Sequence, residues 1–170
     1  MTRAERLQFI EKLAPYAIKT MRETGIPASV IIAQATIESS DSQGNWGHSP
    51  LATEDNNFFG IKARRRNGIP IEPYCEHNTR EWNRKLKKYT IEREPFRKFQ
   101  SIQECFDRHA ELLSSEERYQ PAMKAVSDPY KFALQLQLCG YATDPNYASM
   151  LIGRIKNWDI ARFDAAGRSK

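Results

Sequence analysis

The sequence is poor in the residues that cross-link small proteins. It has only three histidines, scattered along the chain, and three cysteines, Cys75, Cys105 and Cys139. An odd number of cysteines at wide, irregular spacing fits neither a disulfide framework nor a zinc site. We interpret them as small hydrophobic residues, although a nucleophilic pair of one cysteine and one histidine stays open. We expect no metal and no cofactor.

The chain also lacks a long hydrophobic run. No apolar stretch approaches the roughly 20 residues that span a bilayer. The first residues, MTRAERLQFIEKL, mix acids and bases where a signal peptide needs an uninterrupted apolar segment. We therefore expect neither a membrane span nor a signal peptide in this chain. Its 170 residues suffice for one core without cross-links, so we predict a single domain over residues 1–164 and a tail at 165–170.

The net charge of +5 is unevenly distributed. The segment from Lys62 to Lys98 carries twelve Lys or Arg against five Glu, a local charge of +7, so the rest of the chain sums to −2. A basic face of this kind indicates a polyanionic partner, either nucleic acid or an acidic cell-wall polymer. A solvated basic loop without a specific partner is an equally good interpretation.

Apolar periodicity and cap residues predict a mainly α (α+β) fold. The segment ASVIIAQATIES, after Pro27, is apolar nearly all round, as in a helix at the centre of a domain. Ser101 and Glu104 form a predicted capping box, and Asp128-Pro129 and Thr143-Asp144-Pro145 are predicted helix starts. The expected helices cover residues 5–23, 28–39, 50–55, 101–113, a short segment at 121, 128–139 and 143–158.

The helical period disappears between residues 62 and 99. Pro70, Pro73 and Pro95 accompany two β-favouring stretches, Gly68 to Tyr74 and Lys88 to Arg93. This pattern predicts a small, irregular β-hairpin lobe.

Glu38 is the residue that stands out chemically. It lies at the C-terminal end of an otherwise apolar helix, where the helix dipole and the apolar neighbours both disfavour a negative charge. Both effects raise the pKa of a carboxyl, which suits a general acid that works near neutral pH. By position alone, a glutamate that frays into solvent at the helix end is the favoured alternative.

Several short segments, in order, resemble the glucosaminidase family of peptidoglycan hydrolases, which includes the flagellar rod muralytic domain and many autolysins. They are AQATIES (33–39), WGHS (46–49), LA (51–52), NNFFGIK (56–62), FRKFQS (96–101) and GYATDPNYA (140–148). The resemblance spans about residues 28–157, and the ordered set is far more specific than any one segment. It implies a lysozyme-like helical domain with a small β-lobe.

The resemblance also implies two catalytic carboxylates. Glu38 corresponds to the proton donor to the glycosidic oxygen. The family's second acidic residue lies in a T-x-E-aromatic motif, which Thr79-Arg80-Glu81-Trp82 matches. Glu81 is therefore expected to activate water or to stabilise the oxocarbenium-like transition state. Glu72 and Glu76 are the competing candidates for this role, because the basic lobe departs from the family's glycine-punctuated hairpin.

Aromatic rings fit the faces of sugar rings, which suggests five residues as walls of a glycan groove. They are Trp46, Phe58, Phe59, Tyr141 and Tyr147. The resemblance matches Tyr147, and also Tyr141, to a tyrosine near the catalytic acid, although each of the five could equally be packing. Gln34, one turn before Glu38 on the same helix face, is expected to support the acid or the substrate. Residues 40–45 form an insertion relative to the family, so the position of Trp46 is open.

Together these features predict an endo-β-N-acetylglucosaminidase that cleaves the β-1,4 bond between N-acetylglucosamine and N-acetylmuramic acid. Its partner is then the peptidoglycan strand at the bacterial cell wall, periplasmic or extracellular, with the Lys62–Lys98 face toward anionic wall polymers. A muramidase that acts on the same polymer and a non-catalytic wall-binding module are the alternatives. Nucleic-acid binding has only the charge in its favour and no recognised motif, so we do not expect it.

Overall fold

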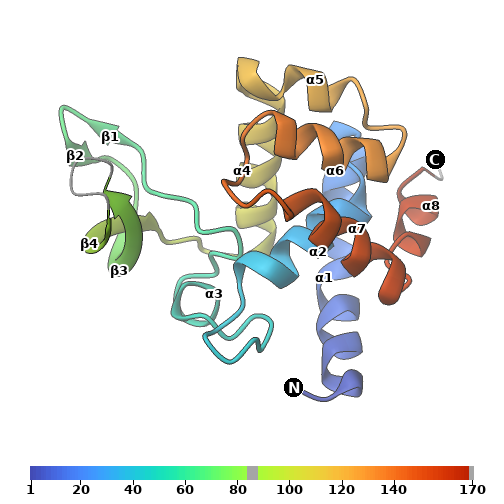
Figure 1. Cartoon of the computed structure of the whole chain (residues 1–170), viewed down its shortest axis with the longest axis horizontal. Coiled ribbons are helices and arrows are strands. Elements are labelled where there is room, and N and C mark those ends of the chain that lie inside the picture. Colours follow the sequence, from blue (N-terminus) through green and yellow to red (C-terminus); the bar gives the residue numbers. More distant parts are fainter. Residues whose placement is uncertain (84–87, 169–170) are drawn as a thin grey trace.

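The computed structural model describes residues 1–83 and 88–168, with side chains throughout except at residues 80–83 and 88–89. Helices gather on one side of the molecule, and the β-lobe, residues 62–99, projects from them (Figure 1). The helices are α1 (Arg3–Thr24), α2 (Ala28–Glu38), α3 (Pro50–Glu54), α4 (Ile102–Ser115), η1 (Glu117–Tyr119), α5 (Gln120–Met123), α6 (Pro129–Leu138), α7 (Tyr147–Asn157) and α8 (Arg162–Arg168). The predicted mainly helical class is confirmed.

Helix α1 begins and ends with cap residues. The Thr2 side chain accepts a hydrogen bond from Glu5 N, and the Glu5 carboxylate accepts one from Thr2 N, a capping box that the sequence analysis missed. At the other end Gly25 has φ of 79°, which a glycine adopts at little cost, and this terminates the helix as predicted.

Helix α2 is the central helix that the sequence predicts. Residues 28–36 are all buried, and the helix packs against α1, α6, α7 and α8. At its start Ser29 donates from both N and Oγ to the carboxylate of Asp164 in α8. This buried link explains why residues 165–168, which we expected to form a tail, instead belong to α8.

Two predicted helix starts differ from the structure. Ser101 does cap α4, but the Glu104 carboxylate accepts from Gln100 N and Arg97 Nη2, so only half of the predicted capping box forms. The helix beginning at Thr143-Asp144-Pro145 is wrong by several residues, because Asp144 Oδ1 accepts from Asn146 N in a turn and α7 begins at Tyr147. Asp128 caps α6 as predicted, accepting from two backbone N–H groups.

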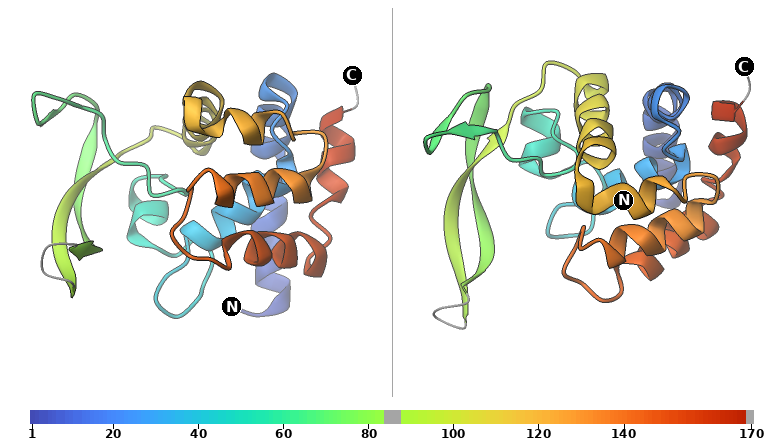
Figure 2. Two further views of the ribbon diagram at one scale, coloured as in Figure 1. Left: turned by 45° about the horizontal axis from the view of Figure 1, so that its top comes forward. Right: turned by 90° about the horizontal axis from the view of Figure 1, so that it is seen from above.

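The β-lobe is more regular than expected. Strands β3 (Tyr74–Asn83) and β4 (Lys88–Arg97) form a long antiparallel ladder that stands apart from the helices (Figure 2). The predicted β stretch from Gly68 to Tyr74 contributes β2 (Ile69–Pro70), which pairs with β1 (Arg65–Arg66). Its last residue, Tyr74, is also the first residue of β3. Among the described residues, no helix combines the length and apolar character needed to cross a membrane.

Candidate active site

Glu38 is the last residue of α2 and lines a cavity of about 350 Å³ at the junction of the helices and the β-lobe. Its lining residues come from α2, α4, η1 and two connecting segments that are far apart in the sequence. Besides Glu38 they are Phe59, Gly60, Ile61, Lys62, Arg108, His109, Leu112, Arg118, Tyr119, Tyr141 and Ala142. Three of the residues predicted for the site, Glu38, Phe59 and Tyr141, thus line one cavity.

The environment of Glu38 favours its protonated form. Burial raises the pKa of the Glu38 carboxyl, and a hydrogen bond from Tyr147 only partly opposes this effect. That bond joins Tyr147 Oη to Glu38 Oε1 over 3.3 Å. The alternative in which Glu38 frays into solvent is wrong, because its side chain is half-buried and bonded to another helix.

Gln34 orients the tyrosine that contacts Glu38. Its Nε2 donates to Tyr147 Oη over 3.0 Å, and because an amide N–H can only donate, the tyrosine hydroxyl keeps its own hydrogen for Glu38. Gln34 is fully buried, and it reaches Glu38 only through Tyr147. Burial and the Glu38 charge both raise the pKa of Tyr147, which keeps the hydroxyl protonated as a donor.

A second set of rings supports this arrangement. Tyr141 stacks on Tyr147 with ring centroids 5.4 Å apart, and its hydroxyl lies 3.1 Å from Nε2 of His109. His109 in turn stacks on Phe59 at 3.9 Å. Burial lowers the pKa of His109 to about 3, so the imidazole is neutral. His109 was not predicted from the sequence, although its place on the buried face of α4, beside Cys105 and Ala110, is a detectable signal.

Three cationic side chains, Lys62, Arg108 and Arg118, also line the cavity. Arg108 pairs with Glu111 and Arg118 with Glu116, so both arginines lie near Glu38 without pairing with it. The sequence indicated a basic face only within residues 62–98 and gave no reason to single out the two arginines of α4 and η1. Among the described residues, no group of three or more His, Cys, Asp or Glu side chains is arranged to hold a metal ion.

Trp46 and Phe58 lie away from Glu38. Trp46 is 2% exposed and meets Trp158 edge to face, while Phe58 is 3% exposed and packs between Phe9 and Phe106. Both border a different cavity of about 640 Å³, near the start of α1. The structure therefore does not bring these two predicted groove residues to the Glu38 cavity.

The three candidates for the second carboxylate have different surroundings. The backbone of Glu81 lies in β3 opposite Thr90, but its side chain is outside those that the structure describes. Burial raises the pKa of Glu72, but hydrogen bonds from Arg64 and the charges of Arg97 and Arg64 outweigh it and lower the pKa. Glu76 is exposed and forms an ion pair with Arg93 over 2.7 Å.

Known proteins show which family the chain belongs to. Residues 14–159 match the glucosaminidase family, described as mannosyl-glycoprotein endo-beta-N-acetylglucosaminidase. The chain belongs to the glucosaminidase family. Its fold is also that of a solved family relative, the catalytic domain of the autolysin Auto from Listeria monocytogenes. The TM-score is 0.80 at 26% identity, over 96% of this chain and 90% of that one. The predicted lysozyme-like architecture is confirmed.

Curated relatives with the glucosaminidase domain are longer proteins. Exo-glucosaminidase LytG of Bacillus subtilis is 33% identical over 97% of this chain and 56% of its own length. Peptidoglycan hydrolase FlgJ of Pseudomonas aeruginosa is 32% identical over 83% of this chain and 34% of its own length. The chain thus spans between about a third and just over half of these two relatives.

Proposed function

We propose that the chain is a peptidoglycan hydrolase, an endo-β-N-acetylglucosaminidase that cleaves the β-1,4 bond on the reducing side of N-acetylglucosamine. The observation that carries the proposal is the Glu38 carboxyl, which lines a cavity, has a raised pKa and accepts a hydrogen bond from Tyr147. Family membership and the names of the relatives support the substrate class. The chain then acts at the bacterial cell wall, in a periplasmic or extracellular location.

In this mechanism Glu38 is the general acid. The protonated carboxyl gives its proton to the bridging oxygen as the glycosidic C–O bond breaks, and the leaving sugar departs as an alcohol. The carboxylate that remains accepts the hydrogen bond from Tyr147 Oη, and this bond strengthens as the negative charge develops. Gln34 holds the tyrosine hydroxyl in the donating orientation, so the chain Gln34 to Tyr147 to Glu38 is set before substrate arrives.

Glu81 is proposed as the second carboxylate, which activates water or stabilises the oxocarbenium-like transition state. The motif match is its main support. The surroundings of its rivals also favour it, because Glu72 is tied to Arg64 and Arg97 at 2.7 and 2.6 Å, and Glu76 is tied to Arg93. Glu81→Gln is expected to lose most turnover, whereas Glu76→Gln keeps it. The reverse result would assign the role to Glu76.

The cavity suits a glycan that carries acidic substituents. Phe59, Tyr119 and Tyr141 line it with aromatic rings, and Lys62, Arg108 and Arg118 supply positive charge. Carboxylates of the peptide stems attached to the glycan provide the matching negative charge. The substrate-binding role proposed for Trp46 and Phe58 has no such support, because both border the other cavity.

Analysis of new reducing ends tests which bond is cut. Purified peptidoglycan is digested, the products are reduced with borohydride, and the reduced sugars are identified by mass spectrometry. Reduced glucosamine ends support the proposal, whereas reduced muramic acid ends would identify a muramidase. The length of the products separates internal cleavage from stepwise release at chain ends, the mode named in the relative LytG. Absence of new ends would favour a wall-binding module.

A further inference from the structure

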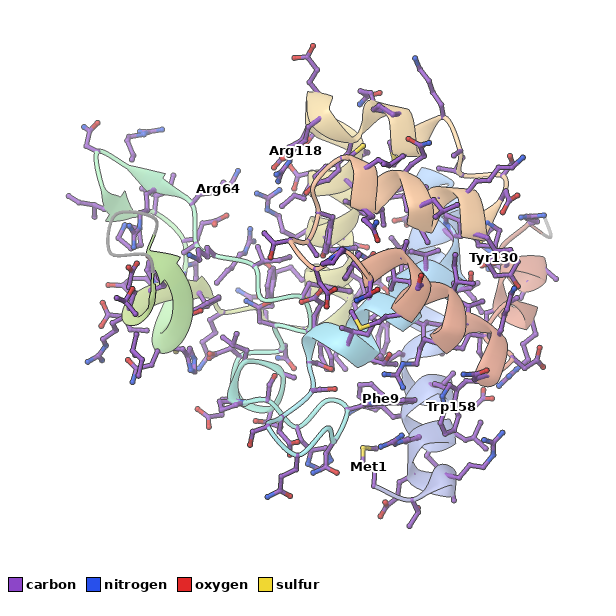
Figure 3. All side chains as sticks on the ribbon, viewed as in Figure 1. Met1, Phe9, Arg64, Arg118, Tyr130 and Trp158 are labelled. Carbon is purple, nitrogen blue, oxygen red and sulfur yellow. The ribbon has the colours of Figure 1, made fainter. Side chains whose placement is uncertain are left out.

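Three arginines converge on two tryptophans at the start of α1 and the end of α7. The rings of Trp46 and Trp158 meet edge to face, with centroids 5.0 Å apart. The Arg154 guanidinium lies 4.3 Å and that of Arg6 4.9 Å from the centre of the Trp46 ring, and Arg3 lies 4.7 Å from that of Trp158. These five residues are called the Arg–Trp cluster. Figure 3 shows Trp158 beside the N-terminal half of α1.

Among the residues that the structure describes, the arginines of the Arg–Trp cluster have no acidic partner. Within the described part of the chain, none of the three guanidinium groups forms an ion pair or a hydrogen bond, and Arg6 Nε is buried without any partner. The β-lobe differs in this respect. Its cations Arg64, Arg65, Arg93, Arg97 and Lys98 each lie within 4 Å of a carboxylate.

The position of these charges is unfavourable without a ligand. Arg3 and Arg6 occupy the first turns of α1, where the helix dipole repels a positive charge. Burial lowers the pKa of Arg154, and the charge of Arg6 lowers it further, which shows that the guanidinium groups repel one another. The tryptophan rings offset part of this cost, but among the described residues no anion does so, which leaves the three charges open to an anionic ligand.

A tryptophan ring attracts the positive charge of a guanidinium group but does not occupy its planar fork of N–H donors as a carboxylate does. Among the described residues, no acceptor pairs with the forks of Arg3, which is exposed, and Arg154, which is partly exposed. Such forks match the two oxygens of a carboxylate or phosphate. We propose that the Arg–Trp cluster binds an oxyanion of the cell wall, either a stem-peptide carboxylate or a phosphodiester of an accessory polymer. The source of this anion rests on the proposed function.

The cluster is separate from the proposed active site. Tyr147, at the start of α7, contacts Glu38, whereas Trp158 follows the last residue of that helix, roughly 16 Å away along the axis. Substitution of cluster arginines therefore leaves the Gln34, Tyr147 and Glu38 contacts intact. Binding and turnover can be measured independently.

The test is co-sedimentation with purified peptidoglycan in low salt, with Glu38→Gln in every protein to keep the wall intact. Arg3→Gln/Arg154→Gln is compared with Lys124→Gln/Lys131→Gln, which removes the same charge from two exposed sites outside the basic lobe. The cluster variant is expected to bind about tenfold more weakly, because two charge-assisted contacts are lost. The control is expected to change by less than about twofold. Thermal unfolding checks that each variant is folded.

Three further arms make the result decisive. If the glutamine variant does not fold, Arg3→Lys/Arg154→Lys keeps the charge but removes the forks, and weaker binding is still expected. Inorganic phosphate should displace the protein better than chloride at equal ionic strength. Treating the wall with hydrofluoric acid removes phosphodiester polymers, and amidation neutralises carboxylates; the treatment that abolishes the Arg-dependent binding identifies the source.

Equal losses in the two double variants, or no advantage of phosphate over chloride, would overturn the oxyanion site. The proposed hydrolase activity fails in a different way. If the chain with intact Glu38 binds the wall through the Arg–Trp cluster but releases no reducing ends, the activity is refuted and the oxyanion site stands.

Discussion

A glutamate at the end of a buried helix can remain stable by staying protonated or by gaining hydrogen-bond donors. Glu38 has one donor, Tyr147 Oη, and among the described residues no cation pairs with it. Burial therefore dominates and the pKa of the carboxyl lies above its ordinary value of 4.5. This combination is unfavourable for folding at neutral pH, but it is suited to a proton donor.

Glu38→Gln is expected to stabilise the fold at pH 7. A raised carboxyl pKa means that the folded state binds the proton more tightly than the unfolded state. The contribution of Glu38 to the free energy of unfolding therefore decreases as the pH rises above 4.5. The neutral amide does not suffer this loss. The melting temperature of Glu38→Gln should exceed that of the wild type at pH 7, and the difference should vanish near pH 4. A lower melting temperature at pH 7 would contradict the raised pKa.

Tyr147→Phe is expected to shift the pH dependence of turnover. The Tyr147 hydrogen bond lowers the pKa of Glu38, so its removal raises that pKa and moves the alkaline limb of activity to higher pH. Tyr141→Phe is the matched control, because the Tyr141 hydroxyl is hydrogen-bonded to His109, and the bond that lowers the pKa of Glu38 comes from Tyr147. Initial rates on peptidoglycan across pH 4–9 measure both. An equal shift in the two variants would refute the specific role of Tyr147.

At this scale the sequence indicated Glu38, Tyr147 and Gln34, but not the other side chains that lie around the cavity. A lone glutamate in an apolar helix is visible in the sequence, and the motifs indicated Tyr147 and Tyr141. His109 and Arg118 were missed, because their place at the cavity depends on how α4 and η1 pack against α2. Trp46 was misplaced because the inserted loop at residues 40–45 carries it against Trp158 instead.

Individual glycine and asparagine residues fix the conformation of the segments that connect the helices and the β-lobe. Gly47 ends the inserted loop with φ of 72°, and its backbone lies directly against the Phe9 ring of α1. Asn57 precedes the β-lobe and is 1% exposed. A substitution at Gly47 or at Asn57 can be compared with the same substitution at a second glycine or asparagine that lacks the contact.

Gly47→Ala is expected to cost about 2 to 4 kcal/mol of stability, because a left-handed backbone and a clash with the Phe9 ring add together. Gly44→Ala separates the two effects. Gly44 has φ of 76°, but no atom lies within 4 Å of an added Cβ, so only the backbone cost of about 1 to 2 kcal/mol remains. Urea unfolding measures both, and equal losses would show that contact with Phe9 contributes nothing.

Asn57→Ala is expected to loosen the attachment of the β-lobe. Its Nδ2 donates to Ile61 O at 2.8 Å and to Arg97 O at 2.9 Å, and its Oδ1 accepts from Ile61 N. Loss of these buried bonds should destabilise the fold by about 2 to 4 kcal/mol. Asn78→Ala, on the exposed part of β3, should change stability by less than about 0.5 kcal/mol. A comparable effect at both sites, measured by urea unfolding, would contradict the role of Asn57.

Helices were predicted well where the apolar pattern is strong, as in α1 and α2, or where a cap residue is clear, as in α6. Helix α7 was placed too early, because Asp144 forms a turn with Asn146 and does not cap the helix. Helix α8 was missed because only its contact with Ser29 shows that the segment is anchored. The long β3–β4 ladder was underestimated because Pro95 and the many charged residues break the usual strand pattern.

At the scale of the whole molecule, the proposed site depends on the tertiary fold. Glu38 comes from α2, Tyr147 from α7, and His109 from α4, and the base of the β-lobe closes the cavity at Lys62. Charge is also organised at this scale. Many cations of the basic lobe are neutralised by ion pairs, whereas the arginines of the Arg–Trp cluster have no acidic partner among the described residues. The net charge of the sequence could not reveal this difference.

The central claim is that Glu38 is the proton donor. The most direct test compares the turnover of peptidoglycan by the wild type and by Glu38→Gln when the same amount of each protein is bound to the wall. The account predicts that the wild type releases reduced glucosamine ends, and that Glu38→Gln binds the wall normally, remains folded and loses at least about a hundredfold in rate. Turnover within a few-fold of the wild type in the folded variant would contradict the account and assign the acid to another residue.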